Sequence, residues 1–205
     1  MKFWNHFKIG KLIHKSMKNN GMPLNKILFI YGNLAPDVSL SYIFRNHSRD
    51  VSASYLDKQL RYLYAGNHIS GCAMFSYSLG IMSHYICDFL CYPHTPAFDG
   101  GTREHYIHEK TQTVNICDML PYSKRAGKGL NLDKLTKALD SYISRREKMY
   151  AQSSEIKYGE IPYAIYIATW ASGNVYLNAS EKTTVSRNRI IYSGSGVAAS
   201  LVKSG

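Results

Sequence analysis

The sequence predicts an all-α protein, a multi-helix bundle that folds as a single domain. In several segments apolar residues recur at the three- to four-residue spacing of amphipathic helices, whereas the alternation typical of half-buried strands is scarce. The chain has 205 residues, 45% of them hydrophobic, which is enough to bury one core. Residues 1–186 are expected to form this domain. Residues 187–205 are rich in Ser and Gly and are expected to form a flexible tail.

A first amphipathic helix is predicted over residues 3–18. Ile9, Ile13 and Met17 project onto one face at about 100° per residue, and the lysines of this segment fall on the opposite face. His6 lies in the middle of the apolar face, where a lone histidine is usually a hydrogen-bonded core residue. An Asn-Asn-Gly sequence then predicts the end of the helix.

The following segments contain more turn-forming residues. An apolar segment at residues 24–31 leads into residues 32–37, where glycine, asparagine and proline together predict a turn. Because Asp37 follows a proline, it is a candidate helix N-cap as well as a candidate ligand. The polar residues 45–52 predict a loop, and residues 54–64 predict a helix.

The longest apolar segment, at residues 74–91, is apolar around its whole helical circumference, which predicts a central buried helix. Pro93 is expected to stop this helix. Residues 99–101 contain two glycines and predict a loop, after which Thr102 is a candidate N-cap for the next helix. Two further helices are predicted, over residues 133–151 and 162–178.

The charge balance favours anionic partners. The chain contains 25 Lys and Arg residues against 14 Asp and Glu residues, a formal net charge of +11. Phosphate esters, nucleic acids and acidic lipid surfaces are the partner classes that such a charge attracts. The lysines are spread along the chain and form no dense run, so generic basicity is the alternative interpretation.

No membrane span is expected from the sequence. The N-terminal residues contain no apolar signal core or cleavage site, and the apolar residues 74–90 carry ionisable groups near the centre of the segment. The predicted location is therefore the cytoplasm, with peripheral contact to an anionic membrane as an option. The four cysteines form no CxxC pair and are expected to be reduced core thiols rather than a disulfide framework or metal ligands.

Histidines and carboxylates gather in the middle of the chain at the spacing of metal ligands. His84 and Asp88 are four residues apart, and residues at this spacing share one face of a helix. His105 and Glu109 form a second such pair, and His94 lies between the two pairs. Imidazole nitrogen and carboxylate oxygen together suit zinc better than magnesium or calcium. Because burying two carboxylates without a cation is costly, metal binding explains the pattern better than a buried polar network.

At these residues the chain resembles the bacterial zinc-dependent phospholipase C family, which is related to the fungal single-strand-specific nucleases. The likeness is closest over residues 75–94 and residues 105–109, and it extends more weakly over roughly the first 115 residues. The resemblance implies an all-α fold that holds three zinc ions in one cleft.

The resemblance also implies a role for each matching residue. His84 and Asp88 match the family's helical pair, whose aspartate bridges two metals. Asp37 and His47 match the aspartate and histidine that complete the shell of the first metal, although a solvated loop histidine is the alternative for His47. His6 matches the histidine that opens the family's first helix. The matches to the three protein ligands of the remaining metal are His94, His105 and Glu109.

The N-terminus departs from the family pattern. Family members commonly use a processed N-terminal tryptophan, whose own amine and carbonyl bind metal. Here the tryptophan is Trp4, two residues before His6, and a retained Met1 would offer its amine as the substitute. Two or three zinc ions are therefore expected, and the third depends on this amine.

The expected function is hydrolysis of a phospholipid head-group phosphodiester by a metal-activated water, with Asp37 as the candidate catalytic residue that orients or deprotonates this water. A nuclease or nucleotide phosphodiesterase with the same zinc cluster is one alternative, and the net positive charge supports it. A catalytically inactive, zinc-stabilised binder of anionic lipid or phosphate is the other. His108 is adjacent to Glu109 and does not have the four-residue spacing of a ligand pair. It is expected to support the ligands or to lie at the surface.

Overall fold

The computed structural model describes residues 1–39, 48–65, 72–112, 130–152 and 160–201, and the side chains of these residues as far as residue 184. All regular secondary structure in these ranges is helical, so the predicted all-α fold is confirmed. The helices are α1 (Phe3–Asn19), α2 (Lys26–Val38), α4 (Arg49–Tyr64), α5 (Ala73–Phe89), the short 3-10 helix η1 (Tyr92–His94), α6 (Thr102–Thr111), α7 (Leu132–Gln152) and α8 (Glu160–Leu201).

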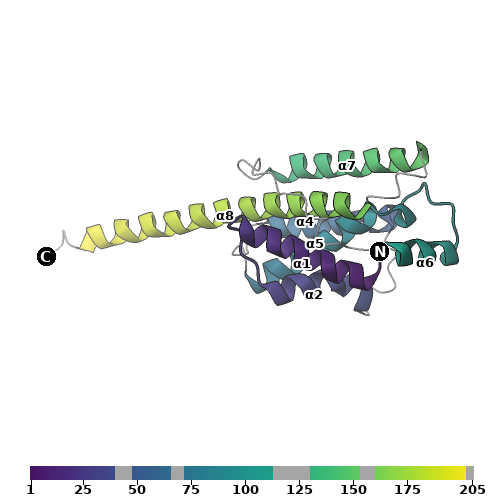
Figure 1. The fold of residues 1–205 in the computed structure, drawn as a ribbon. Coiled ribbons are helices and arrows are strands. Elements are labelled where there is room, and N and C mark those ends of the chain that lie inside the picture. The colour runs from purple at the N-terminus through teal and green to yellow at the C-terminus, as the bar shows by residue number, and fades with distance from the viewer. Residues whose placement is uncertain (40–47, 66–71, 113–129, 153–159, 202–205) are drawn as a thin grey trace.

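α5 is the central helix of the bundle (Figure 1). It packs against α2, α8, α4 and α1, and α2 makes the most extensive contact with it. α7 forms an outer layer on α4 and α8. α6 lies beside the N-terminus at one end of the bundle, whereas α8 extends past the other helices at the opposite end. The N-terminus and α6 are therefore neighbours in space although they are far apart in the sequence.

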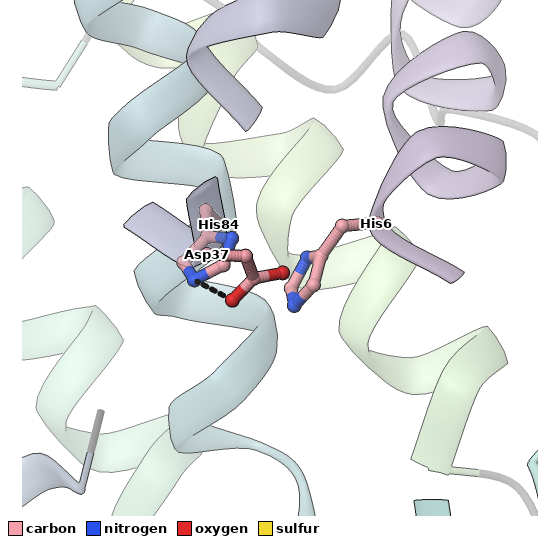
Figure 2. A group of neighbouring side chains, drawn as sticks. All are labelled: His6, Asp37 and His84. Carbon is pink, nitrogen blue, oxygen red and sulfur yellow. Dashed lines mark ion pairs between the residues drawn. The ribbon is translucent and has the colours of Figure 1, made fainter. Parts of the chain in front are cut away.

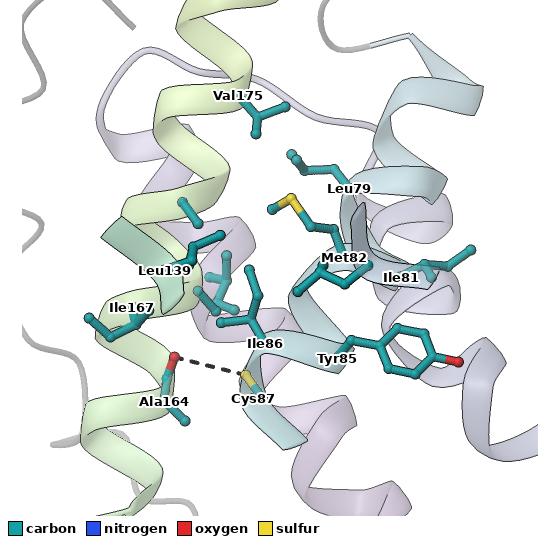
Figure 3. Packing of buried hydrophobic residues seen from close by; sticks show 14 of the residues in the cluster. Leu79, Ile81, Met82, Tyr85, Ile86, Cys87, Leu139, Ala164, Ile167 and Val175 are labelled. Atoms are coloured by element: carbon teal, nitrogen blue, oxygen red, sulfur yellow. Dashed lines mark hydrogen bonds between the residues drawn. The ribbon is translucent and has the colours of Figure 1, made fainter. Parts of the chain in front are cut away.

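The core surrounds α5, as the sequence predicted. Leu79, Met82 and Ile86 of this helix are buried among residues of its neighbours, which include Ile167 and Val175 of α8 (Figure 3). Burying an aliphatic side chain of this size contributes about 1.5–3 kcal/mol to stability. From Ser78 to Phe89 every residue of α5 is buried, so its ionisable residues are buried as well, and these residues begin the functional site.

Residues 32–37 are helical, so the turn predicted at this position is wrong. α2 continues to Val38 and contains Pro36 in its last turn. A proline at this position removes one backbone hydrogen bond, and the packing of α2 against α5 compensates for the loss. The glycine that suggested a turn serves helix packing instead.

Gly32 of α2 and Gly80 of α5 allow the two helices to touch. A Cβ atom on Gly32 would collide with the backbone of Tyr77, and a Cβ atom on Gly80 would collide with the backbone of Phe29. Only a residue without a side chain fits at either position. The backbones of α2 and α5 are therefore in direct contact, and this contact sets the position of the C-terminal end of α2.

α1 agrees with its prediction. The three apolar residues of its predicted face are fully buried, and the four lysines of the opposite face are exposed. Gly21 has a φ of +73° and ends the helix in a Schellman motif. In this motif the amide of Gly21 donates to the carbonyl of Lys18, and the amide of Met22 donates to the carbonyl of Met17.

Two helix starts differ from the prediction. α4 begins at Arg49, earlier than predicted, with Asp50 in the first turn, where a negative charge stabilises the helix. The N-cap of α6 is Gly101 and not Thr102. The amide of Gly101 donates to Oε2 of Glu104 at 3.1 Å, which satisfies a backbone donor at the start of this helix.

α8 is helical as far as Leu201, so the backbone of most of the expected tail is helical. The domain boundary at residue 186 and the flexibility of residues 187–205 stay predictions. In the described part of the chain, no helix combines the length and the apolar character that crossing a membrane requires.

Replacing Gly80 with alanine tests the contact between α2 and α5. The added Cβ would collide with the α2 backbone, so Gly80→Ala is expected to lower the free energy of unfolding by about 1–3 kcal/mol, the usual cost of overpacking. Urea denaturation followed by circular dichroism measures this change. Gly10→Ala is the control, because its Cβ would meet the nearest side-chain atom, Cβ of Asn33, at 3.4 Å and alanine favours a helix. A Gly80→Ala protein as stable as the wild type would contradict the close contact.

Candidate metal centre

Two groups of potential metal ligands lie next to each other near the N-terminus. The first group consists of His6 from α1, Asp37 from α2 and His84 from α5 (Figure 2). Nε2 of His84 lies 3.7 Å from Oδ1 of Asp37, and the rings of His6 and His84 are stacked with centroids 3.9 Å apart. Both histidines are fully buried, whereas the Asp37 side chain is 17% exposed.

Asp88 adjoins this group from the same face of α5 as His84. Its Oδ2 lies 3.0 Å from Nε2 of His84, and its Oδ1 lies 3.0 Å from Nε2 of His6. Nδ1 of His84 lies 2.9 Å from the carbonyl oxygen of Asn33 and must donate to it, because a carbonyl only accepts. The α2 backbone thus fixes the orientation of the His84 ring and directs Nε2 towards the carboxylates. Metal-bound histidines are commonly held in this way, by a hydrogen bond from the ring nitrogen that does not bind the metal.

The second group consists of His94 from η1 and of His105 and Glu109 from α6. Oε1 of Glu109 lies 3.1 Å from Nε2 of His105 and 3.6 Å from Nε2 of His94. The amine of Met1 lies among these residues, 2.8 Å from Oε1 of Glu109 and 2.7 Å from Nε2 of His94. The predicted candidates from η1, α6 and the N-terminus are therefore brought together.

Asp88 connects the two groups. Besides its contacts with His6 and His84, its Oδ1 lies 3.0 Å from the Met1 amine and 3.9 Å from Nε2 of His94. One fully buried carboxylate thus contacts members of both groups. This is the position that a carboxylate bridging two cations would occupy.

Neighbouring charges outweigh the effect of burial on several of these groups. Burial would raise the pKa of Asp88, yet the Met1 ammonium and the adjacent histidines hold it well below its usual range. Burial would likewise lower the pKa of the Met1 amine, yet Asp88, Cys91 and Glu109 raise it to about 12. Burial and the Met1 ammonium lower the pKa of His94 to about 4, so its imidazole is neutral at pH 7. An ionised carboxylate and a neutral imidazole are the protonation states that metal ligands require.

These residues fit a zinc centre. Nε2 of His84 faces the carboxylates of Asp88 and Asp37, which raise the pKa of His84 although burial opposes the charged form, so a positive charge is favoured at this position. Nδ1 of His6 is buried and has no hydrogen-bond partner among the described residues. Buried polar atoms of this kind usually have a partner, which a bound ion or water can supply. The donor set of imidazoles, carboxylates and an amine is one that zinc accepts.

Asp37 lies in the last turn of α2, so its alternative role as a helix N-cap is wrong. His47 lies outside the described residues.

A third group of potential ligands lies beside the centre. It consists of Cys91, His108 and Glu160. The sequence patterns predicted a core thiol at Cys91 and a supporting or surface residue at His108, and they did not single out Glu160. Burial and the adjacent Glu160 carboxylate raise the pKa of the Cys91 thiol well above its usual range. No local spacing could have revealed this group, because Glu160 belongs to a helix that begins far along the chain.

An open pocket of about 540 Å³ adjoins the second ligand group. His94 and His105 form part of its wall, together with the polar residues Thr95, Thr102 and Asp50. The pocket therefore leads from solvent to two of the candidate ligands.

Comparisons with known proteins identify the family. A search of curated proteins and a search of solved structures each found no match. The family model described as zinc dependent phospholipase C matches residues 5–157, which is more than half of the chain. The matched range contains both ligand groups and Asp88. The chain therefore belongs to the zinc-dependent phospholipase C family.

Proposed function

We propose that this protein is a zinc-dependent phosphodiester hydrolase of the phospholipase C type that acts on a phospholipid. The position of Asp88 carries this proposal, because its carboxylate contacts members of both ligand groups. A shared carboxylate suits two cations held close together, roughly 3.5–4 Å apart in two-metal phosphoesterase sites. The family of the chain supports the same conclusion.

The proposed ligands follow from the two groups. The first metal ion is assigned to the ligand group on α1, α2 and α5. The second metal ion is assigned to the ligand group on η1 and α6, and Asp88 lies between the two. His47 is proposed as a further ligand from the resemblance alone. The full assignment is His6, Asp37, His47, His84 and Asp88 on one side, and Asp88, His94, His105 and Glu109 on the other.

The Met1 amine is proposed as the last ligand. It lies within 3.0 Å of Asp88, Glu109 and His94, at the junction of the two groups. An ammonium has no lone pair, so the amine would release a proton when a metal ion binds. The two carboxylates that now face the ammonium would then face the metal ion. The amine would thus take the part that the N-terminal tryptophan has in the family pattern.

Zinc bound here would lower the pKa of a coordinated water towards about 7 and would stabilise charge on the phosphoryl oxygens. Asp37 is the proposed catalytic residue because its side chain is partly exposed, whereas His6 and His84 are fully buried. From this position Asp37 can orient a water molecule and accept its proton as the water attacks the phosphorus in line with the departing alkoxide. The hydrogen bond from His84 to the α2 backbone keeps the opposite wall of the site fixed.

The pocket beside the second group is the proposed binding site for the head group. Its volume of about 540 Å³ lies within the range of small-molecule sites. His94 and His105 reach it from one side, and the hydroxyl group of Thr102 offers a hydrogen bond to a phosphodiester. A phosphate bound there would lie next to the proposed metal positions.

An exposed aromatic surface near the N-terminus supports contact with an anionic membrane. Trp4 is 67% exposed, and Tyr106 and Ile107 of α6 are 57% and 48% exposed. Nζ of Lys2, the residue before α1, lies 4.8 Å from the centre of the Tyr106 ring, so the start of α1 lies near α6. Lys11 is exposed on the same helix as Trp4. Aromatic rings together with lysines favour the interface of a membrane that contains anionic lipid.

Asp88→Asn tests the bridging carboxylate. The substitution keeps the side-chain shape and removes its charge. The variant is expected to hold at least one zinc ion fewer per chain, and its rate of phosphatidylcholine hydrolysis is expected to fall by more than about 100-fold. Mass spectrometry of protein purified without chelator or added metal counts the zinc. Asp57→Asn is the control, because Asp57 pairs with Arg61 on the surface of α4. Full zinc content and full activity in Asp88→Asn would contradict the proposal.

Parallel assays of the wild type with single-stranded DNA separate the two kinds of substrate. Faster hydrolysis of phosphatidylcholine is the expected result. Faster cleavage of DNA would favour the nuclease alternative. Bound zinc and vesicle binding without hydrolysis of either substrate would favour the inactive binding protein.

A glycine added before Met1 tests the proposed amine ligand. One extra residue moves the amine by about 3.5 Å, away from Asp88 and Glu109. The extended protein is expected to hold one zinc ion fewer per chain than the wild type, and intact mass spectrometry verifies both N-termini. The control is a glycine added after Gly205. If the N-terminal extension left the zinc content unchanged, the amine would not be a ligand.

Trp4→Ala tests the membrane surface. Loss of the exposed indole is expected to weaken binding to vesicles that contain phosphatidylserine by about tenfold, and added salt is expected to weaken it further. Co-sedimentation at several lipid concentrations measures the affinity. Ile27→Ala is the control, because Ile27 is 79% exposed at the opposite end of the α1–α2 pair. Equal affinities of Trp4→Ala and the wild type would assign membrane contact to a different surface.

A further inference from the structure

We propose that Cys91, His108 and Glu160 form a separate metal site of the zinc class, which fastens α6 to the bundle. Their ligand atoms, Sγ, Nε2 and a carboxylate oxygen, lie within 4.8 Å of one another. This site shares no residue with the two groups assigned above. It therefore stands independently of the proposed hydrolase activity.

The distances in this group are close to those between zinc ligands. Nε2 of His108 lies 3.0 Å from Oε2 of Glu160, and Sγ of Cys91 lies 3.3 Å from the same oxygen. Bond lengths of about 2.0–2.3 Å at tetrahedral angles place two zinc ligands about 3.3–3.5 Å apart. The two groups of the main centre show the same pattern of imidazole and carboxylate in near contact. Shifts of a few tenths of an ångström would complete the geometry.

The charges of the group balance those of a divalent cation. Glu160 is fully buried, and in the described part of the chain its hydrogen-bond partners are the Cys91 thiol, the His108 ring and the amide of Tyr92. On binding, the Cys91 thiol would release its proton to solvent and its sulfur would bond to the metal as a thiolate. A thiolate, a carboxylate and a neutral imidazole around a divalent ion form an uncharged unit, which is favourable in a buried site. Sulfur, nitrogen and oxygen ligands together select zinc over magnesium or calcium.

The position of the site explains what it would do. None of the residues of α6 is buried, so apolar packing contributes little to holding this helix. Its side-chain contacts with the body are largely polar: His105 and Glu109 face the main centre, whereas His108 faces Glu160 at the start of α8. A metal ion shared by His108, Glu160 and Cys91 would join α6 to α8 and to the end of α5. The site would therefore position the helix that supplies two candidate ligands of the main centre.

Cobalt substitution provides a test, because a cobalt–thiolate bond gives a charge-transfer absorption band in the near ultraviolet. The main centre contains no sulfur ligand, so this band would report on the Cys91 site alone and would be independent of hydrolysis. The band is expected in the cobalt-loaded wild type and in Cys72→Ser, and it is expected to be absent from Cys91→Ser. Cys72 is the matched control, because it is the N-cap of α5, where serine is favoured. Zinc counted by mass spectrometry is expected to be one ion per chain lower in Cys91→Ser than in Cys72→Ser.

Glu160→Gln keeps the shape of the site and removes one negative charge, so the cobalt band is expected to weaken strongly in this variant. Circular dichroism checks that each variant is folded. If Cys91→Ser does not fold, the cobalt bands of the wild type and of Glu160→Gln provide the test. A cobalt-loaded wild type without the band would overturn the proposal and leave a hydrogen-bonded His108–Glu160 pair as the role of the group. A band that persisted in folded Cys91→Ser would overturn it as well, because a different thiol would then bind the metal.

Discussion

The buried carboxylate of Asp88 determines much of the arrangement at the N-terminal end of the bundle. It belongs to the fully buried part of α5, and an ionised carboxylate in such a place needs cations or hydrogen-bond donors around it. These partners are the Met1 amine and the rings of His6, His84 and His94. They come from the N-terminus, α1, α5 and η1. The Asp88 carboxylate thus contacts segments that lie far apart in the sequence.

The contact between α2 and α5 gives the first ligand group its geometry. Because Gly32 and Gly80 let the two backbones touch, the carbonyl of Asn33 reaches the His84 ring and fixes its orientation. Asp37 lies one turn further along α2 and approaches the other nitrogen of the same ring. A side chain at either glycine would push α2 away from α5 and would move Asp37 away from His84. A packing feature without any charge therefore controls the distance between two proposed ligands.

α6 is attached to the bundle in a different way. α1 and α5 are held by buried apolar side chains, whereas α6 has no buried residue and contacts the body largely through His105, Glu109 and His108. The strength of such polar contacts depends on protonation and on bound ions. We therefore expect the attachment of this helix, which supplies two proposed ligands, to depend on metal binding. Metal binding at the centre would then also order α6, which forms part of the wall of the pocket.

The sequence by itself determined the all-α fold and the central buried helix, because periodicity is a local property of a helix. Its resemblance to known proteins indicated the family. The four-residue spacing also brought His84 to Asp88 and His105 to Glu109, because residues at this spacing share one face of a helix. It did not determine that residues 32–37 are helical, since a glycine required for helix packing looks the same in a sequence as a glycine required for a turn. Only the tertiary structure placed the Met1 amine beside Asp88 and Glu160 beside Cys91. These contacts join residues far apart in the chain, and they depend on how whole helices pack.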